Sequence, residues 1–258
     1  MSYRSFVLLL AAALSAMRAQ TPSPAAESGL SQPPAAAPKA QLTPENRGDI
    51  YMARKMYREA IEAFREGPAK DPILLNKTGI AYHQMLQLDN ARKSYELALK
   101  VKPNYLEAIN NLGTIYYAKK SYRRAISYYN RALRIAPEEV RSASIYMNLG
   151  TALFARKRYD DATAAFQHAM RLDPEVAERH GNFGVMLEER SVEERAKYHF
   201  YMAKVYAKNG RNELALQYLR KSLEEGYKDK KIAELPEFSA LRELPEFKEL
   251  MAREPRVL

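Results

Sequence analysis

Cysteine and tryptophan are absent from this 258-residue sequence, and glycine is scarce. Without cysteine the chain can form no disulfide, no zinc–thiolate site and no thiol nucleophile. Ten glycines fit an α-rich protein better than a β-sandwich, which uses more glycine in its turns. Positive charge, in contrast, is in surplus, with 41 Lys and Arg against 31 Asp and Glu and a formal net charge of +10. A basic surface favours acidic protein, anionic lipid or nucleic acid without choosing among them.

The sequence also lacks the motifs that common enzyme classes require. No strand precedes a Gly-rich loop that would hold a phosphate, and there is no Gly-x-Ser-x-Gly nucleophile elbow. The histidines are not spaced as a metal-binding pair on one helix face; they are His83, His168, His180 and His199. We therefore expect no enzymatic activity, no metal site and no cofactor.

Residues 1–19 have the layout of a secretory signal peptide. Arg4 supplies positive charge, and residues 6–14 form an apolar run that is short for a membrane span. Cleavage after Ala16 and cleavage after Ala19 both fit the small residues that follow, and an uncleaved anchor is the alternative. Because cysteine is absent, a lipid anchor at this place is excluded. The pattern predicts an exported protein, periplasmic or secreted. The Pro/Ala-rich residues 20–43 are predicted to be a disordered spacer.

From residue 44 onward the chain repeats itself. Each unit has a glycine, here called the marker glycine, followed after 12 residues by alanine and after 16 by an aromatic residue. A small residue follows after 19 and a proline after 24. The marker glycines are Gly48, Gly79, Gly113 and Gly150, and the matching aromatics are Phe64, Tyr95, Tyr129 and Phe166. Steps of three and four residues keep side chains on one helix face, so each unit predicts an antiparallel helix pair.

The small and bulky positions in each unit have distinct predicted roles. Glycine costs about 1 kcal/mol in a helix relative to alanine, so its recurrence indicates a close crossing with the partner helix. The prolines, Pro72, Pro103, Pro137 and Pro174, are expected to end each second helix because proline cannot continue its hydrogen bonding. A single pair cannot bury its apolar stripe, whereas stacked pairs can.

This pattern resembles the tetratricopeptide repeat, and residues 106–139 are its best copy. The resemblance implies an all-α, right-handed α-solenoid of stacked antiparallel helix pairs whose first helices line a concave groove. The predicted units are about 44–71, 72–105, 106–139, 143–176 and 177–226, the last with an irregular junction in which helix 192–209 fits two registers. Residues 227–258 are predicted to form short capping helices in which Phe238 and Phe247 cover the end of the solenoid. A docking peptide for a partner is the alternative.

A polar residue recurs two positions before the marker glycine. The set, here called the amide ladder, comprises Asn46, Asn111, Asn148 and Asn182, with Lys77 in the second unit. Two residues are about 200° around a helix, so these side chains are predicted to point away from the partner helix and toward the groove. A carboxamide donates and accepts hydrogen bonds, so it can bind the backbone of an extended client without reading its sequence. The resemblance implies this role, and the alternative is that asparagine recurs here without a client.

Two further sets accompany the amide ladder. Four residues past the marker glycine lie His83, Tyr117 and Phe154, which either contact client side chains or pack between first helices. The turns inside the units carry a basic edge, composed of Arg54, Lys55, Lys119, Lys120, Arg156, Lys157 and Arg158. These charges are either solvated or in contact with acidic protein, anionic lipid or anionic glycan.

Together these patterns predict a non-enzymatic scaffold of the cell envelope or secreted space that binds a protein or peptide client in its groove. An envelope or secretion complex is the expected setting. The first alternative is a structural or assembly subunit that acts through the basic edge. Nucleic-acid binding conflicts with the signal peptide, and membrane contact is expected only through an uncleaved signal segment or the basic edge.

Overall fold

The computed structural model describes residues 42–179, 191–229 and 231–252, which belong to the second of two compact units, Leu42–Leu258. The predicted signal peptide, residues 20–41 of the predicted spacer and Asn182 lie outside the described residues. Every regular element in the described ranges is a helix, so the all-α class is confirmed. Among these helices, none combines the length and apolar character that a membrane crossing needs.

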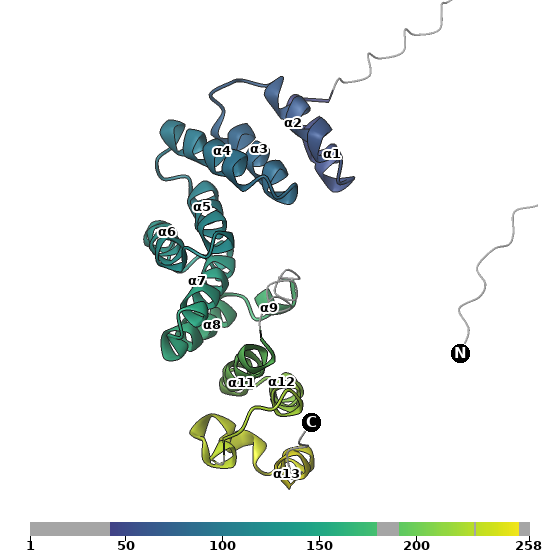
Figure 1. Cartoon of the computed structure of the whole chain (residues 1–258), viewed down its shortest axis with the longest axis vertical. Helices are drawn as coiled ribbons and strands as arrows, with labels where there is room; N and C mark the ends of the chain where they lie inside the picture. The colour runs from purple at the N-terminus through teal and green to yellow at the C-terminus, as the bar shows by residue number, and fades with distance from the viewer. Residues whose placement is uncertain (1–41, 180–190, 230, 253–258) are drawn as a thin grey trace, which may run out of the picture. The chain divides into compact units, whose positions relative to one another are not determined.

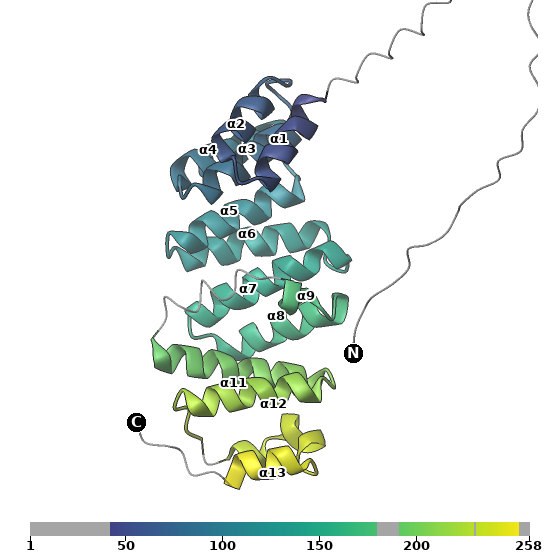
Figure 2. The same ribbon diagram turned by 90° about the vertical axis from the view of Figure 1, so that its right-hand side faces the viewer.

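The helices follow one another as pairs. Each helix packs against its pair partner, and the second helix of each early pair packs against the first helix of the next, as the solenoid prediction requires (Figures 1 and 2). The pairs are α1 Pro44–Ala53 with α2 Tyr57–Arg65, α3 Pro72–Gln84 with α4 Leu88–Val101, α5 Leu106–Ala118 with α6 Tyr122–Ile135, α7 Ala143–Ala155 with α8 Tyr159–Leu172, and α11 Val192–Lys208 with α12 Asn212–Glu224. The short helices η1 Val140–Ser142 and α9 Val176–Arg179 flank the α7–α8 pair.

The marker glycines lie where the two helices of a pair cross. A Cβ atom built on Gly113 would lie 2.5 Å from the Tyr129 ring, and one on Gly150 would lie equally close to the Phe166 ring. Glycine is therefore required by the aromatic side chain 16 residues later. In the last pair Ala203 takes the glycine position and Leu219 takes the aromatic position, both fully buried. The smaller leucine leaves room for the alanine methyl group.

Helix α11 is the first helix of the last pair. It packs against α12 and also against α8, so it occupies the place that α7 has relative to α6 and α8. The structure therefore shows the register in which residues 192–209 begin a pair, and residues 180–190, on which the other register depends, lie outside the described residues. Glu225, just after α12, connects the two helices of the pair. Its Oε2 lies 2.6 Å from His199 Nδ1 and its Oε1 lies 3.2 Å from Arg195 Nε, both in α11.

Pro72 corrects one expectation. It begins α3 instead of ending α2, which already ends at Arg65. Proline suits the first turn of a helix because the N–H that it lacks has no partner there. Asp71 caps the same helix end, and its carboxylate accepts hydrogen bonds from the backbone N–H groups of Ile73 and Leu74 at 2.7 and 3.3 Å. The other three prolines lie two residues past the ends of α4, α6 and α8.

The turn inside each pair passes through the left-handed region at one residue. The φ angle is 59° at Lys55, 58° at Leu86, 56° at Lys120 and 60° at Lys157, and Gly210 takes this place in the last pair with φ 70°. A non-glycine residue in this region costs about 1–2 kcal/mol. Leu86 is 82% exposed and so gains little from packing.

Short helices close the C-terminal end of the described chain. They are η2 Ile232–Glu234, η3 Pro236–Leu241 and α13 Pro245–Ala252. Phe238 and Phe247 are buried, and the Phe238 ring centroid lies 6.1 Å from that of Phe200 in α11. Helices η3 and α13 contact α11 and α12 respectively. The apolar side of the last pair is thereby covered.

Candidate functional site

The first helices of successive pairs lie side by side. Helix α3 contacts α5, and α5 contacts α7. We use the name first-helix face for the surface that is formed by the polar side chains of α1, α3, α5 and α7. It carries the described members of the amide ladder and the residues that pair with them.

The ladder amides of α5 and α7 bond to amides of the preceding first helix. Asn111 Nδ2 donates to Asn76 Oδ1 at 3.0 Å, and Asn148 Nδ2 donates to Asn110 Oδ1 at 3.1 Å. In both pairs the donor stands two residues before its marker glycine, and the acceptor stands three residues before the marker glycine of the preceding unit. The neighbours Asn110 and Asn111 thus serve opposite sides of α5, one as acceptor for α7 and the other as donor to α3.

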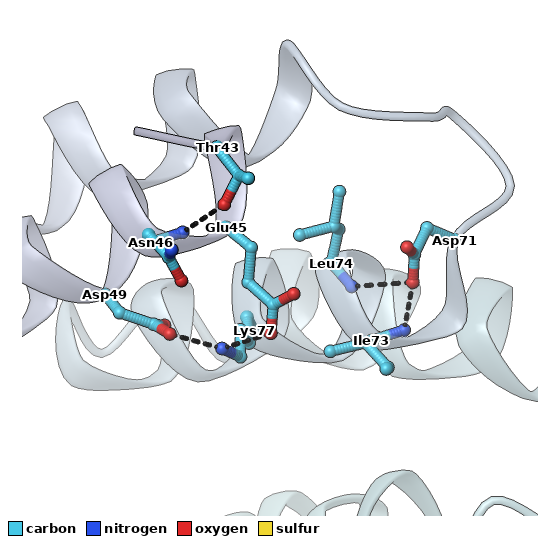
Figure 3. A network of polar contacts seen from close by, with 8 residues as sticks. All are labelled: Thr43, Glu45, Asn46, Asp49, Asp71, Ile73, Leu74 and Lys77. Atoms are coloured by element: carbon cyan, nitrogen blue, oxygen red, sulfur yellow. Dashed lines mark hydrogen bonds and ion pairs between the residues drawn. The ribbon is translucent and has the colours of Figure 1, made fainter. Parts of the chain in front are cut away.

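Lys77 makes the equivalent contact between α3 and α1. Its Nζ lies 2.7 Å from Glu45 Oε1 and 2.5 Å from Asp49 Oδ2 (Figure 3). Burial lowers the pKa of Lys77, but the hydrogen bonds and charges of Asp49 and Glu45 outweigh it, so the pKa lies above its ordinary value. The charged pair therefore occupies the register that amide pairs occupy further along the chain.

These contacts refine the predicted direction of the ladder. The ladder residue and the marker glycine face different neighbours, since Asn111 bonds to Asn76 of the preceding first helix whereas Gly113 lies against Tyr129 of the partner helix. Asn76 and Asn110 were not part of the predicted ladder, although their shared place three residues before a marker glycine was a usable signal. Asn46 is exposed, and its backbone N–H donates to Thr43 Oγ1 at 3.1 Å (Figure 3).

The paired amides keep further hydrogen-bonding groups. A carboxamide has two N–H donors and an oxygen with two lone pairs, and the bond between partners uses one donor and one lone pair. Asn110, Asn111 and Asn148 are half-buried, whereas Asn76 is only 4% exposed. The first three side chains can therefore meet a ligand while their bonds to amides of the neighbouring first helix fix their orientation.

The predicted aromatic neighbours differ in accessibility. Phe154 is buried, with its ring centroid 5.0 Å from that of Tyr159 and 5.5 Å from that of Tyr198. Of the two predicted roles, contact with a client or packing between helices, the structure shows packing for Phe154. Tyr117 and His83 are half-buried, and the Tyr117 ring lies 5.2 Å from that of Tyr122. Burial lowers the pKa of His83 below its ordinary value, which favours the neutral imidazole.

The basic edge is partly paired within the chain. Lys119 Nζ lies 2.5 Å from Asp89 Oδ1, and Arg158 Nε lies 2.7 Å from Asp161 Oδ2. Such exposed pairs contribute at most about 1 kcal/mol. Within the described residues, no group of three or more His, Asp or Glu side chains is placed to hold a metal ion.

Three stretches of the chain match the tetratricopeptide repeat, at residues 73–138, 143–176 and 196–225, together about half of its length. The third match covers the α11–α12 pair in the register that the structure shows.

Curated relatives match over limited segments. The uncharacterized protein ycf37 of Porphyra purpurea is 38% identical over 99 residues, which are 34% of this chain and 57% of the relative. The heat-shock protein cognate co-chaperone sgt12 of Aspergillus fumigatus is 33% identical over 111 residues, 40% of this chain and 31% of the relative. The chain spans 35% of the length of ycf37 from Pyropia yezoensis. Each of these matches is shorter than two thirds of the relative.

Similar solved structures include a form of MamA. The structure of MamA 41-end from Desulfovibrio magneticus RS-1 is 22% identical with a TM-score of 0.48, and the match covers 70% of this chain and 92% of that one. With its helix pairs, its glycine–aromatic crossings and the three matched stretches, this protein belongs to the tetratricopeptide-repeat family, whose members act as scaffolds for protein interactions.

Proposed function

We propose that this protein is a non-catalytic scaffold of the cell envelope or secreted space that binds an extended segment of a client protein across its first-helix face. The observation that carries the proposal is the row of half-buried amides Asn110, Asn111 and Asn148 on α5 and α7. Asn111 is held by its bond to Asn76, and Asn148 and Asn110 are held by the bond between them; these bonds leave further donors and acceptors for a peptide backbone.

The spacing of the row suits an extended chain. Packed helices lie about 8–10 Å apart, and an extended peptide advances about 3.3 Å per residue. One amide position per first helix therefore meets roughly every third residue of the client. Backbone groups recur at every residue, so this contact contributes affinity with little dependence on client sequence.

The α1–α3 end of the face adds charge and apolar contact. Glu45 and Asp49 bring two negative charges against the single positive charge of Lys77. This end therefore favours a basic or N–H-rich part of the client. Ile73 is 42% exposed and offers an aliphatic contact one turn away from Lys77.

The test selects peptides from a displayed random library on the wild-type protein and measures their affinity by calorimetry. An Asn111→Ala/Asn148→Ala variant is expected to bind the selected peptides about 10-fold more weakly, because each lost hydrogen bond contributes about 0.5–1.5 kcal/mol. A Ser127→Ala/Asn130→Ala variant, altered at exposed positions of α6, is the matched control and keeps its affinity. Equal affinity of wild type and the amide variant contradicts the proposal.

The proposed location has a separate test. The signal-like layout of residues 1–19 supports export. Residues 1–43 fused to alkaline phosphatase should yield active enzyme in a bacterium, because that reporter needs disulfides that form only outside the cytoplasm. An inactive fusion contradicts export.

A further inference from the structure

Most of the net charge of this chain resides in one part of the solenoid. Residues 88–135 contain ten Lys or Arg against three Asp or Glu, which accounts for +7 of the total of +10. Helix α6 carries four arginines and no acidic residue. In α2, α8 and α12, acidic residues are at least as numerous as basic ones. The surplus is therefore concentrated on α6 and on the nearby Lys102, Lys119 and Lys120, and α4 adds +1 with three basic and two acidic residues.

Two contacts bring the ends of α6 near the ends of α4. Lys119, before the start of α6, pairs with Asp89 at the start of α4, with 2.5 Å between Nζ and Oδ1. Near the other end, Arg131 Nη2 donates to the carbonyl oxygen of Pro103 at 2.6 Å. The two helices therefore run in the same direction, and we call the exposed side chains of both helices and of the adjoining Lys120 the basic second-helix face. Its exposed cations are Lys93, Lys100, Lys120, Arg123, Arg124 and Arg134.

The carboxylates beside this face are already engaged. Asp89 pairs with Lys119, and Glu96 Oε1 lies 2.7 Å from Arg92 Nη1. These pairs neutralise Arg92 and Lys119 and leave the six exposed cations in excess. Like charges at such density repel one another, so an anionic partner over this face lowers the electrostatic energy.

Exposed aliphatic side chains lie among the cations. Val101 follows Lys100 at the end of α4, and Ile135 follows Arg134 at the equivalent end of α6. Val101 is 43% exposed, Ile135 is 37% exposed, and Leu97, one turn before Val101, is 46% exposed. An acidic macromolecule pairs with cations but gains little from isolated aliphatic groups. A phospholipid surface accommodates both, because its phosphates bind Lys and Arg and its headgroup–acyl boundary receives apolar side chains.

We propose that the basic second-helix face docks on an anionic phospholipid surface. Arg123, Arg124 and Arg134 contact lipid phosphates, and the aliphatic side chains at the helix ends enter the headgroup–acyl boundary. The face is built from second helices, so it leaves the amide row on the first helices to the client. Lipid docking does not depend on client binding. The basic second-helix face and the basic edge are different sets of residues that have only Lys120 in common.

The experiment uses the full chain and vesicle sedimentation. Vesicles of phosphatidylcholine containing about one third phosphatidylglycerol are compared with phosphatidylcholine alone, at ionic strengths from about 0.1 M to about 1 M. The wild type should bind the anionic vesicles better, and the difference should vanish at high salt. An Arg123→Glu/Arg124→Glu/Arg134→Glu variant should lose roughly 100-fold in partition onto anionic vesicles. The matched control, Arg58→Glu/Lys70→Glu/Arg220→Glu, changes the net charge equally at other exposed sites and should lose far less.

Circular dichroism first establishes that all three proteins are equally helical. A Leu97→Ser/Ile135→Ser variant should weaken binding to anionic vesicles even at high salt, because it removes apolar contacts. Equal losses in the charge variant and its control overturn the proposal, since net charge alone then explains binding. It is also overturned if neutral vesicles bind the wild type as well as anionic ones do, or if only polyglutamate or duplex DNA is bound.

Discussion

Replacing Asn111 with alanine removes the side-chain N–H group on α5 that donates a hydrogen bond to Asn76 on α3. Asn76 Oδ1 accepts this bond at 3.0 Å, and Asn76 is only 4% exposed, so water replaces the lost donor poorly. Leaving a buried acceptor unsatisfied costs about 1–3 kcal/mol. Alanine recovers about 0.5 kcal/mol through its higher helix propensity. We expect Asn111→Ala to lower the free energy of unfolding by about 1–2 kcal/mol.

Asn148→Ala provides the internal comparison. Its bond partner, Asn110, is half-buried, so water can take the place of the lost donor. The loss of about 0.5–1 kcal/mol is then largely offset by helix propensity, and the net change is close to zero. Asn130→Ala, at an exposed position of α6, reports the propensity gain alone.

Urea unfolding followed by circular dichroism measures these effects, and a double-mutant cycle isolates the pair. The cycle with Asn76→Ala cancels the propensity terms and should give a coupling energy of about 1 kcal/mol, because removing both amides leaves no unpaired acceptor. A coupling below about 0.3 kcal/mol, or a larger cost for Asn148→Ala than for Asn111→Ala, refutes the reasoning.

Three further changes test the fold. Gly113→Ala places a methyl group against the Tyr129 ring and should lower the free energy of unfolding by about 1–3 kcal/mol, and adding Tyr129→Leu should restore part of that loss in the same urea assay. Leu86→Gly relieves the left-handed backbone conformation at an exposed turn and should raise the melting temperature, by a stabilisation of up to about 1 kcal/mol; no increase would contradict the assigned strain. Burial lowers the pKa of His83 and His199, so the unfolded chain binds protons that the folded chain does not, and stability should fall as the pH drops through about 6.5. A His83→Gln/His199→Gln variant should lose part of that dependence, and an unchanged pH profile would contradict it.

The sequence predicts the crossings within each pair well, because a glycine opposite a bulky aromatic leaves a steric pattern at fixed spacing. Gly113 with Tyr129 could be paired from the letters alone. Contacts between pairs are harder, because the steps between marker glycines vary and the variation is absorbed in the connections. Pro72 shows this, since it begins the next helix where a helix end was expected.

The candidate site could be predicted only in part, because positions within a unit follow a fixed spacing whereas contacts between units do not. The recurring position of Asn111 and Asn148 was readable, but their partners depend on how neighbouring first helices are offset. Asn76 was missed because the ladder position of its unit is taken by Lys77, which masks the amide one residue earlier. Whether Phe154 faces solvent or the core depends on α11, which the repeat pattern places in two registers.

The most direct test of the central claim is photo-crosslinking of a selected client peptide from two matched positions. Benzoylphenylalanine is placed at Ile73 on the first-helix face or at Leu97 on the outward side of α4, which are 42% and 46% exposed. The account predicts that Ile73 crosslinks the peptide, that Leu97 does not, and that unlabelled peptide competes. Crosslinking from Leu97 alone would place the client on the other face and contradict the account.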